Sequence, residues 1–338
     1  MVTSPATADR PMSFLDGVHQ TYRKAASIVL TTLLVLGWLP AIAQSINVGY
    51  ESATYHGRKF GIGINLKVQI GLRNYDSTAP QWMQLPEDGH ARSSFPEQPW
   101  VHITLQRRVF GRSTTTDTLL DPRNGSAIQR IVQRKDGNRF RYKATQYGPS
   151  GVRVLRTTSA TDPIEVDWQQ ASSTYQSYPS GFTDGLAVSD ASVLFYLLNR
   201  TDLRNPGDSL QIPILGNERL ILLALTVVEL TTSKTNYIER VATVQAPADE
   251  TATETIDPTT ERKVKERRPA ILINVDAKQL DSYSQATDVV VLGMEGDLKI
   301  LLDAVHRMPL RISGRTPRFG KVHLRLKKVD LKVLATQD

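Results

Sequence analysis

A basic segment near the end of the chain holds the side chains best suited to bind a charged partner. The run "HRMPLRISGRTPRFGKVHLRLKKVDLKV", residues 306–333, is dense in Lys and Arg that alternate with Val, Ile and Leu. Successive side chains of a strand point to opposite faces, so this alternation gathers the cations on one face. We predict that this face binds an anionic ligand; an ordinary solvated sheet face is the alternative. The candidate ligand-binding residues are Arg311, Lys321, His323 and Arg325.

The same segment lacks the motifs of nucleotide and nucleic-acid binding. Gly314 and Gly320 enclose five residues rather than the four of a phosphate loop, and Val322 follows Lys321 where that motif has Ser or Thr. No recognition helix or interleaved aromatic residues accompany the cations, so we expect no nucleic-acid partner. At Lys327 and Lys328 the alternation slips by one residue, which predicts a β-bulge there.

Few other residues have the spacing of a catalytic or metal site. The 6 histidines include no pair four residues apart, and no Ser has the flanking residues of a hydrolase nucleophile. The absence of Cys excludes thiolate ligands, Cys nucleophiles and disulfides. Glu165 and Asp167 share one side of a predicted strand, and with His323 they leave a hydrolase as an alternative. We expect no catalytic residue, no metal and no cofactor, and therefore a protein that is not an enzyme.

The N-terminal region has the pattern of an export signal. In "RKAASIVLTTLLVLGWLPAIA", residues 23–43, a basic pair precedes a short apolar run that ends in small residues. We expect a signal peptide over residues 1–43, cleaved after Ala43, with either Met1 or Met12 as the start. An uncleaved membrane anchor is the alternative. An exported chain without Cys suits a bacterial periplasm.

Period-two alternation recurs through the rest of the chain. In "KFGIGINLKVQIGL", residues 59–72, Ile, Leu and Val occupy every second position, which is typical of a half-buried antiparallel strand. Turn sequences such as "DPRNG", "KDGN" and "GPSG" separate the segments. Further strands are predicted over residues 101–110, 139–147, 152–158, 165–170, 219–230, 270–277, 289–295 and 297–303.

These strands predict a mainly β fold with one large antiparallel sheet, strongly curved into a half-barrel or a barrel-like form. One short helix is expected within "SDASVLFYLLNRTDL", where Asp190 can cap the first turn and "NPGD" ends it. We expect a single domain over residues 44–338. Two polar segments without periodicity, residues 77–99 and 246–268, are predicted to be mobile insertions.

Several features in the second half of the chain form one pattern: Ser192 and Tyr196 in the short helix, the "NPGD" turn, Pro309 in "MPLRI", and Gly320 before the last strand. Over roughly residues 45–334 this pattern resembles the DUF3108 family of exported bacterial envelope proteins. The resemblance implies a periplasmic antiparallel β fold without an established activity. The insertion at 246–268 and His306 depart from the family pattern, so a shared ligand site stays open.

Composition and charge complete the functional expectation. The chain is 40% hydrophobic with a formal net charge of +7, and after residue 43 no apolar segment is long enough to cross a bilayer as a helix. We therefore expect a periplasmic, non-enzymatic protein, not integral to the membrane once mature, that binds a lipid, a glycan or another anionic envelope component. The alternative is an envelope-assembly protein that docks on a partner protein through its basic C-terminal hairpin.

Overall fold

The structure is a computed structural model that describes residues 50–73, 99–159, 166–179, 188–216, 219–245, 255–256, 260–279 and 290–334. The chain divides into two compact units, Met1–Ser45 and Ile46–Asp338. All described residues belong to the second unit, so the predicted signal peptide and nearly all of the 77–99 insertion lie outside them. No helix within the described ranges is long and apolar enough to cross a membrane.

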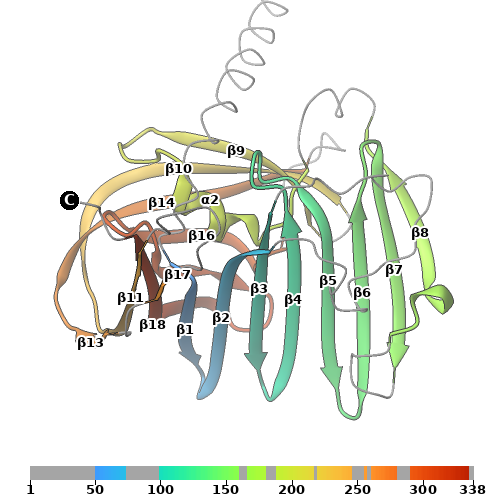
Figure 1. The fold of residues 1–338 in the computed structure, drawn as a ribbon, viewed down its shortest axis with the longest axis horizontal. Coiled ribbons are helices and arrows are strands. Elements are labelled where there is room, and N and C mark those ends of the chain that lie inside the picture. Colours follow the sequence, from blue (N-terminus) through green and yellow to red (C-terminus); the bar gives the residue numbers. More distant parts are fainter. Residues whose placement is uncertain are drawn as a thin grey trace, which may run out of the picture. The chain divides into compact units, whose positions relative to one another are not determined.

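The first half of the unit is a meander in which each strand pairs with the next, antiparallel throughout (Figure 1). Two-residue hairpins join several of these strands, and the alternation predicted for residues 59–72 places Ile64, Leu66, Val68 and Ile70 in the core. The strands are β1 (Ser52–Lys59), β2 (Ile62–Arg73), β3 (Trp100–Val109), β4 (Arg112–Leu120), β5 (Ala127–Asp136), β6 (Arg139–Tyr147), β7 (Gly151–Ser159) and β8 (Ser172–Ser177).

The second half continues the same sheet from the other edge of β1. Its strands are β9 (Ser209–Gly216), β10 (Arg219–Lys234), β11 (Tyr237–Gln245), β12 (Thr255–Ile256), β13 (Thr260–Val264), β14 (Arg267–Gln279), β15 (Val290–Val291), β16 (Met294–Asp303), β17 (Pro309–Thr316) and β18 (Gly320–Leu334). From β1 the pairing runs through β18, β17, β16, β14 and β10 to β9. Among the described strands, β8 and β9 are the two ends of this curved sheet, which is not closed (Figure 1).

One pair departs from the antiparallel pattern. The β10 and β14 ribbon bends where the Thr235 backbone N–H donates to the Glu266 carbonyl at 2.9 Å, and it continues as β11 and β13. This bend brings β11 beside the end of β18, where the two strands pair in parallel. The predicted fold class is confirmed, with this parallel pair as an exception.

Helix α2 (Val193–Arg200) packs between the two halves of the sheet. Its residues 193–198 are buried in the main core. Tyr50, just before β1, donates its hydroxyl to the Phe195 carbonyl at 3.1 Å, and Arg307, between β16 and β17, donates to the Thr201 and Leu203 carbonyls at 2.8 and 2.9 Å. The helix therefore fastens the N-terminal meander to the C-terminal strands.

Two predicted segments differ in the structure. The strand expected over residues 165–170 is instead a short 3₁₀ turn, η4 (Trp168–Gln170), capped by Asp167. The predicted mobile insertion at 246–268 contains regular structure at its end, because residues 260–268 form β13 and the start of β14. Arg240 pairs there with Glu261 at 2.5 Å, so part of the charged run is ordered by ion pairs across β11 and β13.

Candidate ligand-binding site

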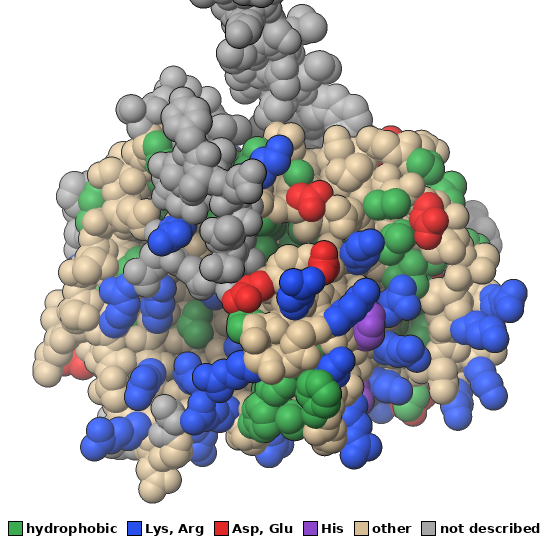
Figure 2. Space-filling view, turned by 180° about the vertical axis from the view of Figure 1, so that it is seen from behind, with side chains coloured by type: hydrophobic (Ala, Val, Ile, Leu, Met, Phe, Trp, Pro, Cys, Tyr) green, Lys and Arg blue, Asp and Glu red, His purple; other side chains and the backbone are tan. Residues whose placement is uncertain are grey.

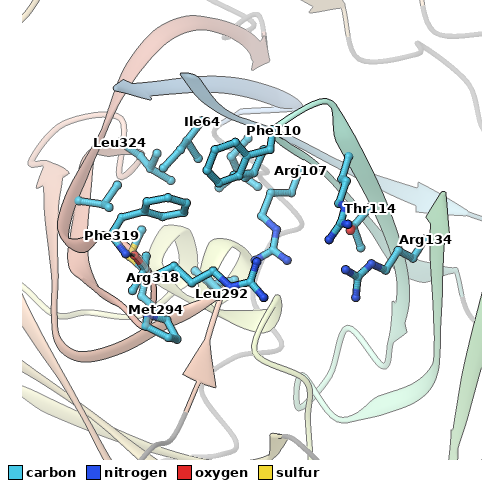
Figure 3. A pocket seen from close by; sticks show the side chains of 17 residues that line it. Ile64, Arg107, Phe110, Thr114, Arg134, Leu292, Met294, Arg318, Phe319 and Leu324 are labelled. Carbon is cyan, nitrogen blue, oxygen red and sulfur yellow. Dashed lines mark hydrogen bonds between the residues drawn. The ribbon is translucent and has the colours of Figure 1, made fainter. Parts of the chain in front are cut away.

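A pocket of about 650 Å³ lies where the hairpin ends of β3 and β4 approach the loop between β17 and β18. Its volume is in the range of small-molecule sites. One side of the pocket is apolar (Figure 3). The apolar lining residues are Ile64, Leu66, Val109, Phe110, Leu292, Met294, Pro317, Phe319, Val322 and Leu324.

Strand pairing explains how these residues meet. In β2 and β3, Ile64 lies opposite Val109 and Leu66 lies opposite Arg107, so all four share one face. From β18, Val322 and Leu324 reach the same space because they occupy alternate positions. The wall is therefore a product of period-two patterning in strands far apart in the sequence.

Arginines from four segments face this wall. Pairing places Arg107 of β3 opposite Thr114 of β4, and Thr114 opposite Arg134 of β5, so that the side chains form a row across the sheet. Arg112 and Arg318 complete the set. Figure 3 shows Arg107, Arg134 and Arg318 reaching toward the middle of the pocket.

The pocket is electrostatically unbalanced. Among the described residues that line it there is no Asp or Glu, and none of these arginines forms an ion pair within the described part of the chain. Burial, and then the charge of Arg134, lower the pKa of Arg107. A Cβ atom at Gly293 would collide with the Arg107 guanidinium, so this Gly allows Arg107 to lie against the β15–β16 turn. The arrangement suits an anionic group held beside an apolar chain.

The four residues predicted from the sequence lie together, but on the other face of β18. Arg311 pairs opposite Arg325, and Lys321, His323 and Arg325 are exposed, whereas Val322 and Leu324 between them line the pocket. Burial and then the charges of Arg311, Lys321, Arg325 and Lys59 lower the pKa of His323. This outer cationic cluster (Arg311, Lys321, His323 and Arg325) is thus a separate surface from the pocket.

Sequence reasoning missed the pocket arginines. Their signal is the segment "RRVFGR", residues 107–112, in which basic residues flank a hairpin, but sequence alone does not show which of them faces the core side. Arg107 lines the pocket, while the next residue, Arg108, pairs on the opposite face with Asn65 and Ser113.

Of the three residues considered for a hydrolase, the structure describes Asp167 and His323. Glu165 lies outside the described residues. Asp167 accepts hydrogen bonds from the Gln169 backbone N–H at 2.9 Å and from Gln170 Nε2 at 2.8 Å, which gives it a capping role. In the described part of the chain no cluster of His, Asp and Glu has the geometry of a metal site.

A grouping of Thr104, His102 and Asp117 also resembles a catalytic triad in composition. His102 Nε2 lies 3.0 Å from Asp117 Oδ1 and 3.4 Å from Thr104 Oγ1, and Thr104 donates to the same carboxylate oxygen at 2.7 Å. In a catalytic triad the two ring nitrogens of the His contact different partners, one the nucleophile and the other the carboxylate. Here one nitrogen faces both, so the group is a structural hydrogen-bond cluster.

The fold and the pocket together define a curved antiparallel β protein with an apolar, arginine-lined cavity. No protein-family model matches the chain, and no curated protein matches it. A search of solved structures found intact Ap-TbpB (N and C lobes), which is 10% identical over 82% of this chain and 77% of that chain, with a TM-score of 0.10. A score this low carries no argument about fold or function.

Proposed function

We propose that this protein is an exported, non-enzymatic binding protein of the bacterial periplasm, and that its pocket holds an amphiphile with a phosphate or carboxylate head. Membership of the DUF3108 family remains part of this proposal. The observation that carries the ligand class is the set of pocket arginines beside an apolar wall, with no carboxylate among the described residues that line the pocket.

The head group would be held by the guanidinium groups. Arginine forms two parallel, charge-assisted hydrogen bonds with phosphate or carboxylate, and such bonds are stronger than neutral ones. Burial and then the charge of Arg134 lower the pKa of Arg107, so the two guanidinium groups repel each other. An anion between them removes that repulsion, so binding stabilises both charges.

The chain of the amphiphile would lie on the wall formed by β2, β18 and the turn at Leu292. Each buried CH₂ group contributes about 0.8 kcal/mol. The wall includes Met294, whose flexible side chain adapts to ligands of different shape. An alkyl chain of moderate length therefore supplies affinity, and the arginines select for charge.

Two oleoyl lipids test this proposal: lysophosphatidic acid, and uncharged monooleoylglycerol with the same chain. Calorimetric titration of the purified protein should show tighter binding of the anionic lipid. Arg107→Gln should weaken that binding about tenfold or more, since a lost hydrogen bond to a charged group costs about 1.5–3 kcal/mol. Arg108→Gln is the matched control, because its side chain lies on the opposite face.

Equal affinity for the two lipids, or an equal loss in Arg107→Gln and Arg108→Gln, would contradict the pocket assignment. Native mass spectrometry of protein purified from its own envelope provides an independent test. It should show a mass adduct that organic extraction identifies as an anionic lipid or another acidic amphiphile.

A second function is favoured by the outer cationic cluster, which is exposed and lies outside the pocket. This surface would dock an acidic envelope protein. Photo-crosslinking in cells from position 323 should then capture one partner repeatedly, and loss of the product in Lys321→Gln and Arg325→Gln would support it. A repeated failure to capture any partner would remove this candidate.

A further inference from the structure

Three hairpin turns at the same end of the strands each carry a Phe-Gly pair. The pairs are Phe60-Gly61 between β1 and β2, Phe110-Gly111 between β3 and β4, and Phe319-Gly320 where the β17–β18 turn enters β18. The pairing of Ile64 with Val109 sets the first two tips side by side. The centroids of the Phe110 and Phe319 rings lie 5.1 Å apart, so the third turn contacts the second. We call these residues the Phe-Gly rim.

Two of the rim phenylalanines are held in a conformation that Phe disfavours. Phe60 and Phe110 have φ angles of 49° and 53°, and the glycines that follow have φ angles of 79° and 73°. Two-residue hairpins of this kind favour Asn or Asp before Gly. The side chains are also exposed, 77% for Phe60 and 56% for Phe110. Hairpin geometry accounts for Phe at neither position, and burial does not account for Phe60.

Cations flank every part of the rim. Lys59 Nζ lies 5.0 Å from the centroid of the Phe60 ring. The segments 58–62, 107–112 and 317–321 contain several Lys and Arg and no Asp or Glu. On the face drawn in Figure 2, a hydrophobic group near the lower edge is surrounded by Lys and Arg. Exposed aromatic side chains within a cationic border are complementary to a negatively charged lipid surface.

We infer that the Phe-Gly rim docks on an anionic lipid bilayer, with Phe60 and Phe110 inserted at headgroup level and the flanking cations on the lipid phosphates. Phe110, Arg112, Arg318 and Phe319 also line the pocket, so docking turns the pocket toward the membrane. The inference does not require the pocket to be occupied. Phe60 belongs to the rim, and neither it nor the flanking Lys59 lines the pocket, which separates the two proposals experimentally.

The test is sedimentation of the full chain with vesicles of phosphatidylethanolamine and phosphatidylglycerol, and with vesicles of phosphatidylcholine alone. The protein should bind the anionic vesicles more tightly, and added salt should weaken that binding. Phe60→Asn should lower the partition coefficient about tenfold, because part of a buried Phe side chain is lost from the interface. Binding of lysophosphatidic acid by Phe60→Asn should be unchanged.

Val305→Asn is the matched control. Val305 is 70% exposed, and it lies in the turn between β16 and β17, at the other end of β17 from Phe319. This variant should bind vesicles like the parent protein. An equal loss in both variants, or no loss in Phe60→Asn, would overturn the inference. So would self-association without lipid that Phe60→Asn abolishes, because the rim would then bind a second copy of the chain.

Discussion

The ring of Phe110 packs against the ring of Phe319 with a centroid separation of 5.1 Å, although the two residues come from hairpins in opposite halves of the chain. Phe60, at the neighbouring tip, has the same backbone conformation as Phe110 but is more exposed. The two residues therefore carry similar backbone strain. Phe110 packs against another ring, whereas the contact described for the Phe60 ring is with Lys59 Nζ at 5.0 Å.

Because of this difference, we expect Asn substitutions at the two positions to change the free energy of unfolding by different amounts. A non-glycine residue in the left-handed region costs about 1–2 kcal/mol, and Asn tolerates that region better than Phe. Phe60→Asn should therefore raise the free energy of unfolding by about 1 kcal/mol. Phe110→Asn should gain less, since the lost aromatic pair is worth about 0.5–1.5 kcal/mol. Urea denaturation measures both. A destabilised Phe60→Asn would show that its ring has a packing role.

A buried ion-pair network at the bend of the β10 and β14 ribbon makes a second prediction. Arg268 lies 3.3 Å from Asp303, 3.6 Å from Glu239 and 2.6 Å from Glu266. Glu239 and Asp303 are fully buried. Arg268→Leu would remove this partner from both carboxylates, while Glu239 keeps Arg262 at 2.6 Å and Asp303 keeps two backbone N–H donors. The loss should therefore destabilise the protein by up to about 3–5 kcal/mol.

The control for this network is an exposed pair. Arg204 and Asp202 lie 2.5 Å apart, and each side chain is 73% exposed. Arg204→Leu should change the free energy of unfolding by less than about 1 kcal/mol. Chemical denaturation of the two variants side by side provides the comparison. Similar small effects would mean that the buried carboxylates find other partners or take up protons.

The outer cationic cluster gives a third prediction, on pH dependence. Burial and the surrounding cations Arg311, Lys321, Arg325 and Lys59 lower the pKa of His323 in the folded state. The unfolded chain therefore binds a proton at His323 before the folded protein does. The contribution of neutral His323 to stability is complete above the unfolded-state pKa of about 6.5. It is lost as the pH falls from there toward the lower pKa of the folded state.

His323→Asn should consequently flatten the decline in stability just below about pH 6.5. An NMR titration of the parent protein should place the His323 pKa below that value. Arg325→Gln should raise the pKa, because one of the repelling charges is gone, whereas Lys135→Gln on β5 should leave it unchanged. A pKa at or above the ordinary value would show that a counter-charge reaches this surface.

Local alternation in the sequence was enough to predict much of the sheet. The predicted β-bulge at Lys327 is confirmed, because Thr54 pairs with Lys328 while Tyr55 pairs with Leu326, leaving Lys327 as the extra residue. Residues 165–170 were predicted wrongly. Asp167 accepts the Gln169 backbone N–H there, and this local bond competes with strand pairing. The parallel pair of β11 and β18 depends on a distant bend and has no local signal.

The pocket could not be predicted from the sequence pattern, for a related reason. Parity shows that Lys321, His323 and Arg325 share a face, but it does not show which face of β18 is closed over by the rest of the chain. Arg107 and Arg134 meet only because two hairpins bring β3, β4 and β5 into register. The apolar wall opposite them includes residues of β18, which is far away in the sequence, so the candidate site required the structure.

The pairing of β1 with β18 joins the two halves of the sheet, and Gly57 makes that close approach feasible. A Cβ at Gly57 would lie 2.6 Å from the His323 carbonyl oxygen and 2.9 Å from Leu324 Cδ2. Gly57→Ala should therefore push β1 away from β18 and destabilise the protein by about 1–3 kcal/mol, with faster amide exchange along that pair.

Gly71→Ala is the comparison, because no heavy atom lies within 4 Å of a Cβ built there and its backbone has no left-handed φ. This variant should be neutral or more stable by about 0.4–1 kcal/mol, since Ala restricts the unfolded chain. Equal effects of the two substitutions would mean that β1 and β18 separate without cost. The sheet would then be two independent halves linked mainly by α2, and hydrogen exchange would show them opening separately.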